Sequence, residues 1–164
     1  MINLIYYTDG SWSNKTKNGG WAWALISENN SSVLQHETGM EPYSTNNRME
    51  LKALSQALKN LAAQQSILVD VKAIFYIDSA LICNCLNEKW YATWMSNNWK
   101  TADRQDVKNK ELWSEILVNY IKLKKICDIK IVKVLSHTNN KWNDFVDKLA
   151  VDARKQLDWL DGVK

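Results

Sequence analysis

The sequence is poor in the residues that interrupt or join folded units. Its 164 residues include one proline and five glycines, and no stretch is repetitive or shows the composition of a flexible linker. A chain of this length fits one compact domain. We therefore predict a single domain over residues 1–164.

Cysteine is also scarce, and its pattern excludes common cysteine-based sites. Cys83, Cys85 and Cys127 form an odd number, and Cys83 and Cys85 lie two residues apart within an apolar run. Zinc sites and disulfide frameworks use other spacings and larger sets of ligands. Free thiols in a reducing compartment are the simpler explanation, so we expect a cytoplasmic protein.

Long apolar runs and a strong charge excess are absent. No segment reaches the roughly 18 apolar residues that a membrane span requires. The first nine residues carry no basic segment and no small-residue cleavage site, so no signal peptide is expected. The 21 basic and 18 acidic side chains give a net charge of +3, which permits a polyanionic partner without requiring one.

Against these shortages the chain has nine tryptophans. An indole ring is large enough to need either a place in the core or a ligand surface. Trp90, Trp94 and Trp99 recur at four- and five-residue steps, a spacing more typical of a core stripe than of a stacking surface. We predict that Trp94 and Trp113 are mainly structural.

Hydrophobic periodicity predicts an α/β fold. The expected strands cover residues 3–11, 21–26, 32–38, 69–77 and 129–135, and the expected helices cover residues 49–61, 79–86, 90–99, 112–125 and 142–159. Short connections, with a tight turn at Gly19 and Gly20 and a loop from Gly39, should make the first three strands antiparallel. The last two strands follow crossovers and should run parallel to the first. Thr45 or Asn46 should cap the first helix.

Acidic residues occur where these elements begin or end. Asp9 lies at the end of the first strand and Asp78 directly follows the fourth; if these two strands are parallel neighbours, both carboxylates should emerge at one edge of the sheet. Glu50 lies in the first turn of a helix, and Asp147 lies on the last helix one turn after Asn143. Each acid alone has an ordinary explanation as a turn residue or a partner of a helix dipole.

If these four acids lay close together in the fold, they would indicate a cation site and not four unrelated structural roles. Clustered carboxylates repel one another unless a cation neutralises them. An all-oxygen set of ligands suits Mg²⁺ or Mn²⁺ rather than zinc. Two such ions about 3.5–4 Å apart can stabilise both the attacking and the leaving oxygen of a phosphoryl displacement, which is the chemistry of a nuclease.

Several segments resemble type 1 ribonuclease H, in particular the bacterial enzymes. They occur in order along nearly the whole chain: Thr8–Ser11 (TDGS), Thr45–Leu51 (TNNRMEL), Ile77–Ser79 (IDS) and Val146–Ala150 (VDKLA). The resemblance implies the ribonuclease-H-like fold, a five-stranded mixed sheet flanked by helices. It also implies an endoribonuclease that hydrolyses the RNA strand of RNA–DNA hybrids and leaves 5′-phosphate and 3′-hydroxyl ends.

The resemblance also assigns the catalytic acids. It implies that Asp9, Glu50, Asp78 and Asp147 hold two Mg²⁺ ions, with Mn²⁺ as an alternative. Asp144 is the competing acid on the last helix, but it lacks the surrounding family motif.

The same resemblance suggests the residues that bind the substrate. Asn46 and Asn47 would read the RNA 2′-hydroxyls, because an amide can both donate and accept a hydrogen bond. Thr45 and Asn109 resemble a pocket that holds a phosphate of the DNA strand. Tyr43 stands where many relatives have an additional arginine of that pocket.

Further expectations concern the periphery of the site. His137 matches a histidine that assists product release or proton transfer, and Asn143 is grouped with the substrate-binding residues. Trp90 would touch a DNA sugar, and Asn14 or Lys15 would assist on the RNA side. A basic segment resembles the protrusion of bacterial members; its cations are Lys89, Lys100, Arg104, Lys108 and Lys110.

Two alternatives stay open at this point. Another polynucleotidyl transferase of the same fold would share the first acidic strand but not the TNNRME segment. A non-catalytic hybrid-binding module would lack one of the acids, whereas all four are present. For the enzyme we expect a monomer whose partner is an RNA–DNA hybrid duplex.

Overall fold

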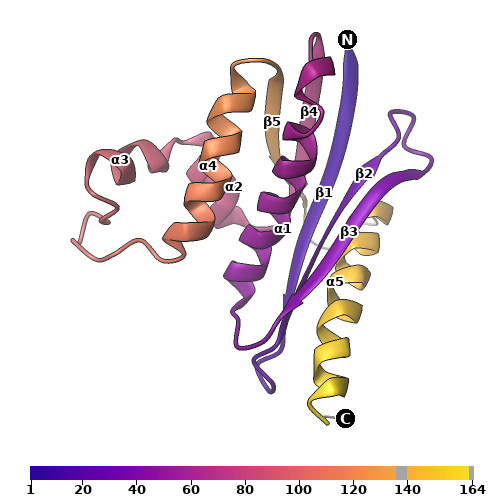
Figure 1. The fold of residues 1–164 in the computed structure, drawn as a ribbon, viewed down its shortest axis with the longest axis vertical. Coiled ribbons are helices and arrows are strands. Elements are labelled where there is room, and N and C mark those ends of the chain that lie inside the picture. The colour runs from indigo at the N-terminus through magenta and orange to yellow at the C-terminus, as the bar shows by residue number, and fades with distance from the viewer. Residues whose placement is uncertain (136–139, 163–164) are drawn as a thin grey trace.

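Five strands form one mixed sheet in the computed structural model, which describes residues 1–135 and 140–162. The strands are β1 (Ile2–Trp12), β2 (Gly19–Ile26), β3 (Val33–Glu41), β4 (Val71–Ile77) and β5 (Asp128–Lys133). Their order is β3-β2-β1-β4-β5 (Figure 1). The first three strands are antiparallel, and β4 and β5 run parallel to β1, which confirms the predicted fold class.

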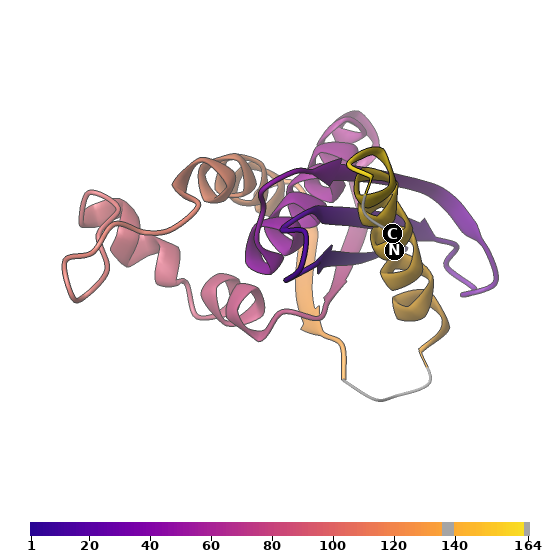
Figure 2. The ribbon, with the colours of Figure 1, turned by 90° about the horizontal axis from the view of Figure 1, so that it is seen from below.

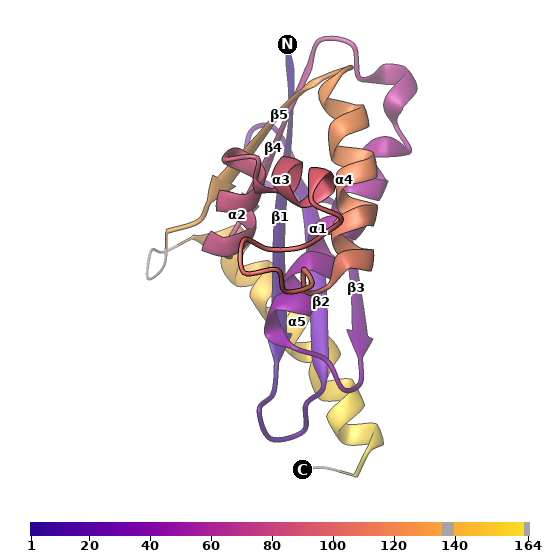
Figure 3. The same cartoon turned by 90° about the vertical axis from the view of Figure 1, so that its left-hand side faces the viewer.

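Helices cover both faces of this sheet. They are α1 (Asn46–Ala62), α2 (Ala80–Asn87), α3 (Trp90–Ser96), α4 (Lys110–Lys124) and α5 (Lys141–Leu160), with a short 3₁₀ turn at Gln65–Ile67. Helices α1 and α4 lie on one face and α5 on the other, while α3 and its flanking loops extend away from the sheet (Figures 2 and 3). In the described part of the chain no helix is long and apolar enough to cross a membrane.

Alternation along the central strands creates two separate cores. Tyr6 is fully buried on the α1 face and stacks on Phe75, with ring centroids 4.7 Å apart. The next residue, Tyr7, faces α5 and stacks on Tyr76 at 4.8 Å. Because successive side chains of a strand point to opposite faces, one strand can anchor helices on both sides of the sheet.

The glycines of β2 and β3 were wrongly expected to form turns and a loop. Gly19 and Gly20 begin β2, and Gly39 lies inside β3, which continues to Glu41. At Gly20 a β-carbon would lie 2.1 Å from the carbonyl oxygen of Ala150, so the missing side chain allows α5 to pass close to the sheet. Gly39 similarly makes room for the indole ring of Trp21.

Helix α3 is shorter than predicted and belongs to a tryptophan-rich substructure. Asn98 and Trp99 adopt left-handed backbone angles, with φ values of 55° and 59°, so the helix ends at Ser96. Trp94 packs against the buried ring of Trp113, with centroids 5.3 Å apart and an interplanar angle of 70°. The structural role predicted for these two tryptophans is confirmed.

Candidate active site

The register of β1 and β4 brings two of the four acids to the same edge. Thr8 pairs with Ile77 across the parallel strands, and Asp9 and Asp78 directly follow these two residues. Asp9 is buried in β1, whereas Asp78 is exposed immediately after β4. The edge thus presents one buried and one solvent-facing carboxylate.

Glu50 reaches the same place because α1 crosses β1 at a glycine. A β-carbon on Gly10 would lie 2.5 Å from the backbone nitrogen of Glu50, so only glycine allows this approach. The Gly10 N–H donates to Asp9 Oδ1 at 2.9 Å and to Glu50 Oε1 at 3.1 Å. One backbone donor therefore serves two carboxylates that are both 5% exposed.

This confinement changes the acidity of both groups. Burial raises the pKa of Asp9 to about 7, with a further contribution from the charge of Asp147. Burial, followed by the charges of Asp9 and Asp78, holds the pKa of Glu50 well above its usual range. All four predicted acids therefore interact electrostatically. The charge on α5 that acts on Asp9 belongs to Asp147, which favours this residue over Asp144.

The composition of the group suits a hard divalent cation. Glu50 Oε2 is buried and has no hydrogen-bond partner among the described residues, and the same holds for Asn143 Oδ1. A bound cation would satisfy such oxygens and favour the charged form of the acids. Among residues 1–135 and 140–162, no group of three or more His, Cys, Asp or Glu side chains is already arranged to hold a metal ion. The exposed side chains of Asp78 and Asp147 would have to turn towards the buried pair to complete such a group.

A second feature is a cavity of about 640 Å³ between the beginnings of α1 and α4. Its lining residues come from three parts of the chain: Thr45, Asn47, Leu81, Lys108 and Asn109. The structure thus brings Thr45 and Asn109 together, although they are far apart in sequence. Lys108 was not among the residues predicted for this pocket, because the sequence indicated only that it belongs to a basic segment. Tyr43 is 90% exposed and is not one of the lining residues.

The local backbone leaves polar groups available in this cavity. Thr45 Oγ1 accepts a hydrogen bond from the Arg48 N–H at 3.1 Å, which confirms Thr45 as the cap of α1 and leaves its hydroxyl hydrogen free to donate. Asn109 precedes α4 in a left-handed conformation, and its side chain makes no capping hydrogen bond. A hydroxyl, an amide and the Lys108 ammonium together form a set of donors for a phosphate.

The other predicted residues lie around these two features. Asn46 is exposed at the start of α1, and Asn47 is partly buried beside the cavity. Trp90 is 37% exposed at the start of α3, away from the sheet (Figure 1). Asn143 lies in the first turn of α5. His137 lies outside the described residues.

Comparison with known proteins agrees with this arrangement. The model of the RNase H family matches residues 2–155. This chain belongs to the RNase H family. The ribonuclease H of Caldicellulosiruptor saccharolyticus is 37% identical over 157 residues, which cover 96% of this chain and 99% of that protein. The ribonuclease H of Acetivibrio thermocellus is 39% identical over 156 residues, covering 95% and 97% of the two chains.

Solved structures support the same fold for this RNase H family member. LC9-RNase H1, described as a type 1 RNase H with the type 2 active-site motif, superposes with a TM-score of 0.74 at 20% identity. That alignment covers 95% of this chain and 74% of the other. LC11-RNase H1, solved in complex with an RNA/DNA hybrid, gives a TM-score of 0.67 at 22% identity and covers 94% and 98% of the two chains.

Proposed function

We propose that this chain is an endoribonuclease that hydrolyses the RNA strand of RNA–DNA hybrids. The observation that carries the proposal is the buried pair of Asp9 and Glu50, held by one backbone N–H next to two further acids. Protein folds rarely bury two unpaired carboxylates together, because the arrangement lowers stability. Such a cost is typical of a functional site.

Asp9, Glu50, Asp78 and Asp147 would hold two divalent cations, with Mg²⁺ as the expected ion and Mn²⁺ as the alternative. Bound ions of this kind activate water and stabilise the charge that develops on the phosphoryl oxygens. The acids themselves position the ions: the buried pair offers oxygens fixed by Gly10, and the exposed pair offers oxygens that can adjust. The expected products carry 5′-phosphate and 3′-hydroxyl ends.

The donor groups around the acids suit the two strands of a hybrid. Asn46 and Asn47 begin the helix that carries Glu50, and in this proposal their amides would pair with RNA 2′-hydroxyls near the cut. Thr45 and Asn109, together with Lys108, would hold a DNA phosphate in the 640 Å³ cavity. Thr45 caps α1 and Asn46 and Asn47 begin it, so the two groups meet at the start of this helix, which would set the register between the strands.

Three residues complete the proposed site. Asn143 would present its partnerless Oδ1 to the substrate or to a hydrated cation. Trp90, exposed on α3, would contact a sugar of the DNA strand. His137 is proposed to assist product release or proton transfer.

The context of the enzyme is proposed on the same basis. Cys83, Cys85 and Cys127 are free thiols, in keeping with a reducing cytoplasm. We propose that residues 1–164 form one catalytic domain that works as a monomer on a hybrid duplex. LC11-RNase H1, which has a similar fold, has been solved in complex with an RNA/DNA hybrid. This supports a hybrid as the substrate that we propose for the present chain.

The test is a comparison of substrates at equal concentration. The wild-type chain, with Mg²⁺, should cut the RNA strand of a labelled hybrid and leave a double-stranded RNA, a double-stranded DNA and the DNA strand of the hybrid intact. Products of the RNA strand should be extended by a polymerase without prior treatment, because they end in 3′-hydroxyls. Equal cutting of all duplexes, or binding of the hybrid without any cleavage, would contradict the proposal.

A further inference from the structure

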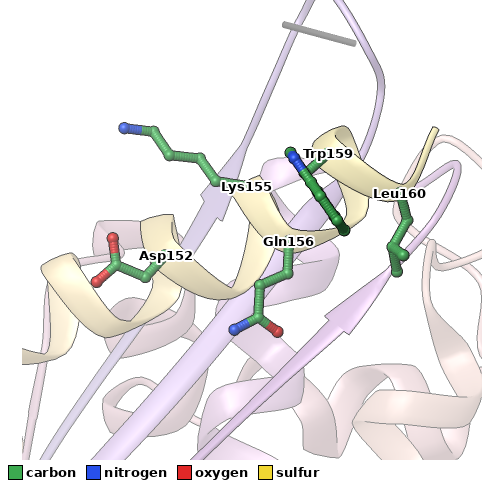
Figure 4. Close-up of a pocket in the computed structure, with 5 residues that line it drawn as sticks. All are labelled: Asp152, Lys155, Gln156, Trp159 and Leu160. Carbon is green, nitrogen blue, oxygen red and sulfur yellow. The ribbon is translucent and has the colours of Figure 1, made fainter. Parts of the chain in front are cut away.

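The end of α5 carries an exposed aromatic side chain that the proposed active site does not use. Trp159 is 77% exposed in the last turn of the helix. A hollow of about 400 Å³ on one side of the ring is lined by Lys15, Lys155 and Trp159, among others. A second hollow of about 420 Å³ lies along the helix between Asp152 and Leu160 and shares Lys155 and Trp159 with the first (Figure 4).

A dense hydrogen-bond network fixes the helix beneath this ring. Asp158 accepts from Thr16 Oγ1 at 2.7 Å and from Asn18 Nδ2 at 2.9 Å, and its other oxygen accepts from Arg154 Nη1 at 3.1 Å. Arg154 Nε also donates to Ser11 Oγ at 3.1 Å. These contacts tie the last turns of α5 to β1 and to the connection that follows it, so the indole ring stands on a positioned support.

The charges at this place are of both signs, and the acids near the ring are held by other residues: Asp161 Oδ2, for example, accepts a hydrogen bond from Asn18 Nδ2 at 2.9 Å. Arg154 and Asp158 neutralise each other, and Asp152 pairs with Lys148 at 3.1 Å. The exposed ammonium groups of Lys15 and Lys155 have no ion-pair partner in the part of the chain that the structure describes. Figure 4 shows Lys155 extending away from α5 one turn before Trp159. Two free cations beside an exposed aromatic ring suit a strand with phosphates and accessible bases.

The surface formed by Lys15, Lys155 and Trp159 lies further along the same helix that carries Asp147. Arg154 and Asp158 follow Asp147 by seven and eleven residues and so lie on the same stripe of α5. Lys155 directly follows Arg154, and Trp159 directly follows Asp158, so both lie beside that stripe. With a rise of about 1.5 Å per residue, Trp159 lies roughly 18 Å along the helix from Asp147. That distance corresponds to about five nucleotides of a stacked strand.

We propose that Lys15, Lys155 and Trp159 bind a single-stranded continuation of the RNA strand beyond the hybrid. This inference rests on the proposed function, because the strand that passes the four acids is the one that is cut. The two ammonium groups pair with phosphates, and the indole ring stacks on an unpaired base. A duplex does not offer its base faces, so a single strand is the occupant that uses all three side chains.

The experiment measures kcat and KM on one hybrid core with five kinds of end: blunt, or extended by about eight unpaired nucleotides at the 5′ or 3′ end of the RNA or of the DNA strand. For the wild type, one RNA extension should lower KM about tenfold relative to the blunt hybrid, with kcat unchanged. Trp159→Ala should remove most of this gain, and Trp159→Phe should keep most of it. The double variant Lys15→Ala, Lys155→Ala should lose most of this gain in KM. For this variant, the KM of the extended hybrid should depend less on salt concentration than it does for the wild type.

Matched controls make the result specific. Lys125→Ala removes an exposed lysine at the end of α4 and should leave the gain intact. Equal thermal midpoints for all variants show that the fold is retained. An equal KM for blunt and extended hybrids, a gain that is confined to DNA extensions, or a gain that survives Trp159→Ala would overturn the proposal while leaving the hybrid activity in place. A wild type that cuts none of the hybrids would contradict the proposed function as well.

One further outcome would also overturn the proposal. If sedimentation shows a wild-type dimer that Trp159→Ala dissociates, and KM is the same for all hybrids, the exposed ring serves a second copy of the chain and not RNA.

Discussion

The four acids of the site fall into two pairs with opposite surroundings. Asp9 and Glu50 are almost completely buried and share one backbone donor, whereas Asp78 and Asp147 face solvent. Burial makes the charged form of the first pair costly, and exposure leaves the second pair nearly free of that cost. In the proposed function this contrast would divide the work: the inner acids would fix where a cation binds, and the outer acids would complete its coordination.

The largest expected effect is on catalysis by the inner pair. Glu50→Gln keeps the size of the side chain but removes an ionisable carboxyl from the buried pair. We expect single-turnover cleavage of a hybrid to slow by about 10³-fold or more. Asp144→Asn is the matched control on α5 and should change the rate less than about threefold. Comparable rates for the wild type and Glu50→Gln would remove the inner acids from the catalytic site.

The next effect is on stability and separates the two pairs directly. The pKa of Asp9 is about 7 in the folded chain and 3.8 without burial, so between these values the folded state binds more protons than the unfolded state. The free energy of unfolding should therefore fall as pH rises from about 4 to about 7 and level off above. Asp9→Asn removes this penalty and should stabilise the protein by on the order of 2 kcal/mol at about pH 8, but not at about pH 4.

The outer pair supplies the control for that measurement. Asp78→Asn and Asp147→Asn should change the free energy of unfolding by less than about 0.5 kcal/mol at either pH, because both side chains are exposed. Urea denaturation at the two pH values is sufficient. If Asp9→Asn destabilised the chain at the higher pH, the buried carboxylate would be a stabilising group and not a cost.

A smaller effect is expected from cations. At about pH 8, Mg²⁺ at roughly ten times its dissociation constant should add about 1.4 kcal/mol to stability and raise the melting temperature by a few degrees. The gain should shrink near pH 5, where protons compete for the acids, and should be lost after chelation. Asp9→Asn should show little of it. An identical rise for this variant would place the bound cation elsewhere.

The smallest effects concern the phosphate cavity, where a side chain that caps a helix can be compared with one that does not. Thr45→Ala removes a helix cap and should cost about 1 kcal/mol of stability as well as raising KM, whereas Thr45→Ser should preserve both. Asn109→Gly should raise KM severalfold without loss of stability, because the Asn109 side chain caps nothing and glycine tolerates the left-handed backbone at this position. A fall in melting temperature for Asn109→Gly, with KM unchanged, would assign that side chain to the fold.

The sequence predicted the elements well where a single periodicity dominates. The apolar runs of β1 and β4, their connections and the three- and four-residue spacing in α1 led to the observed strand directions and to a cap at Thr45 or Asn46, of which the structure has Thr45. Gly20 and Gly39 were misinterpreted because a glycine that admits a neighbouring helix or ring looks the same, in sequence, as a glycine that turns the chain. Only the packing of α5 and Trp21 distinguishes the two cases.

The four acids of the candidate site could be proposed from the sequence, but their burial and hydrogen bonding could not. Motif spacing brought the four acids together, and the register at Thr8 and Ile77 explains why Asp9 and Asp78 meet. No pattern of residues indicated which acids are buried or that Glu50 Oε2 lacks a partner. The support of Trp159 was equally hidden, because it depends on contacts such as Asn18 to Asp158 between distant segments.

The most direct test of the account is cleavage of an end-labelled RNA–DNA hybrid with Mg²⁺ by the wild type and by Asp9→Asn. If the buried acid pair is the catalytic centre, the wild type yields a ladder of shortened RNA, and a folded Asp9→Asn variant that still binds the hybrid leaves the RNA intact. An uncut hybrid with the wild type, or equal cutting by both proteins, would contradict the claim that the buried acid pair is the catalytic centre.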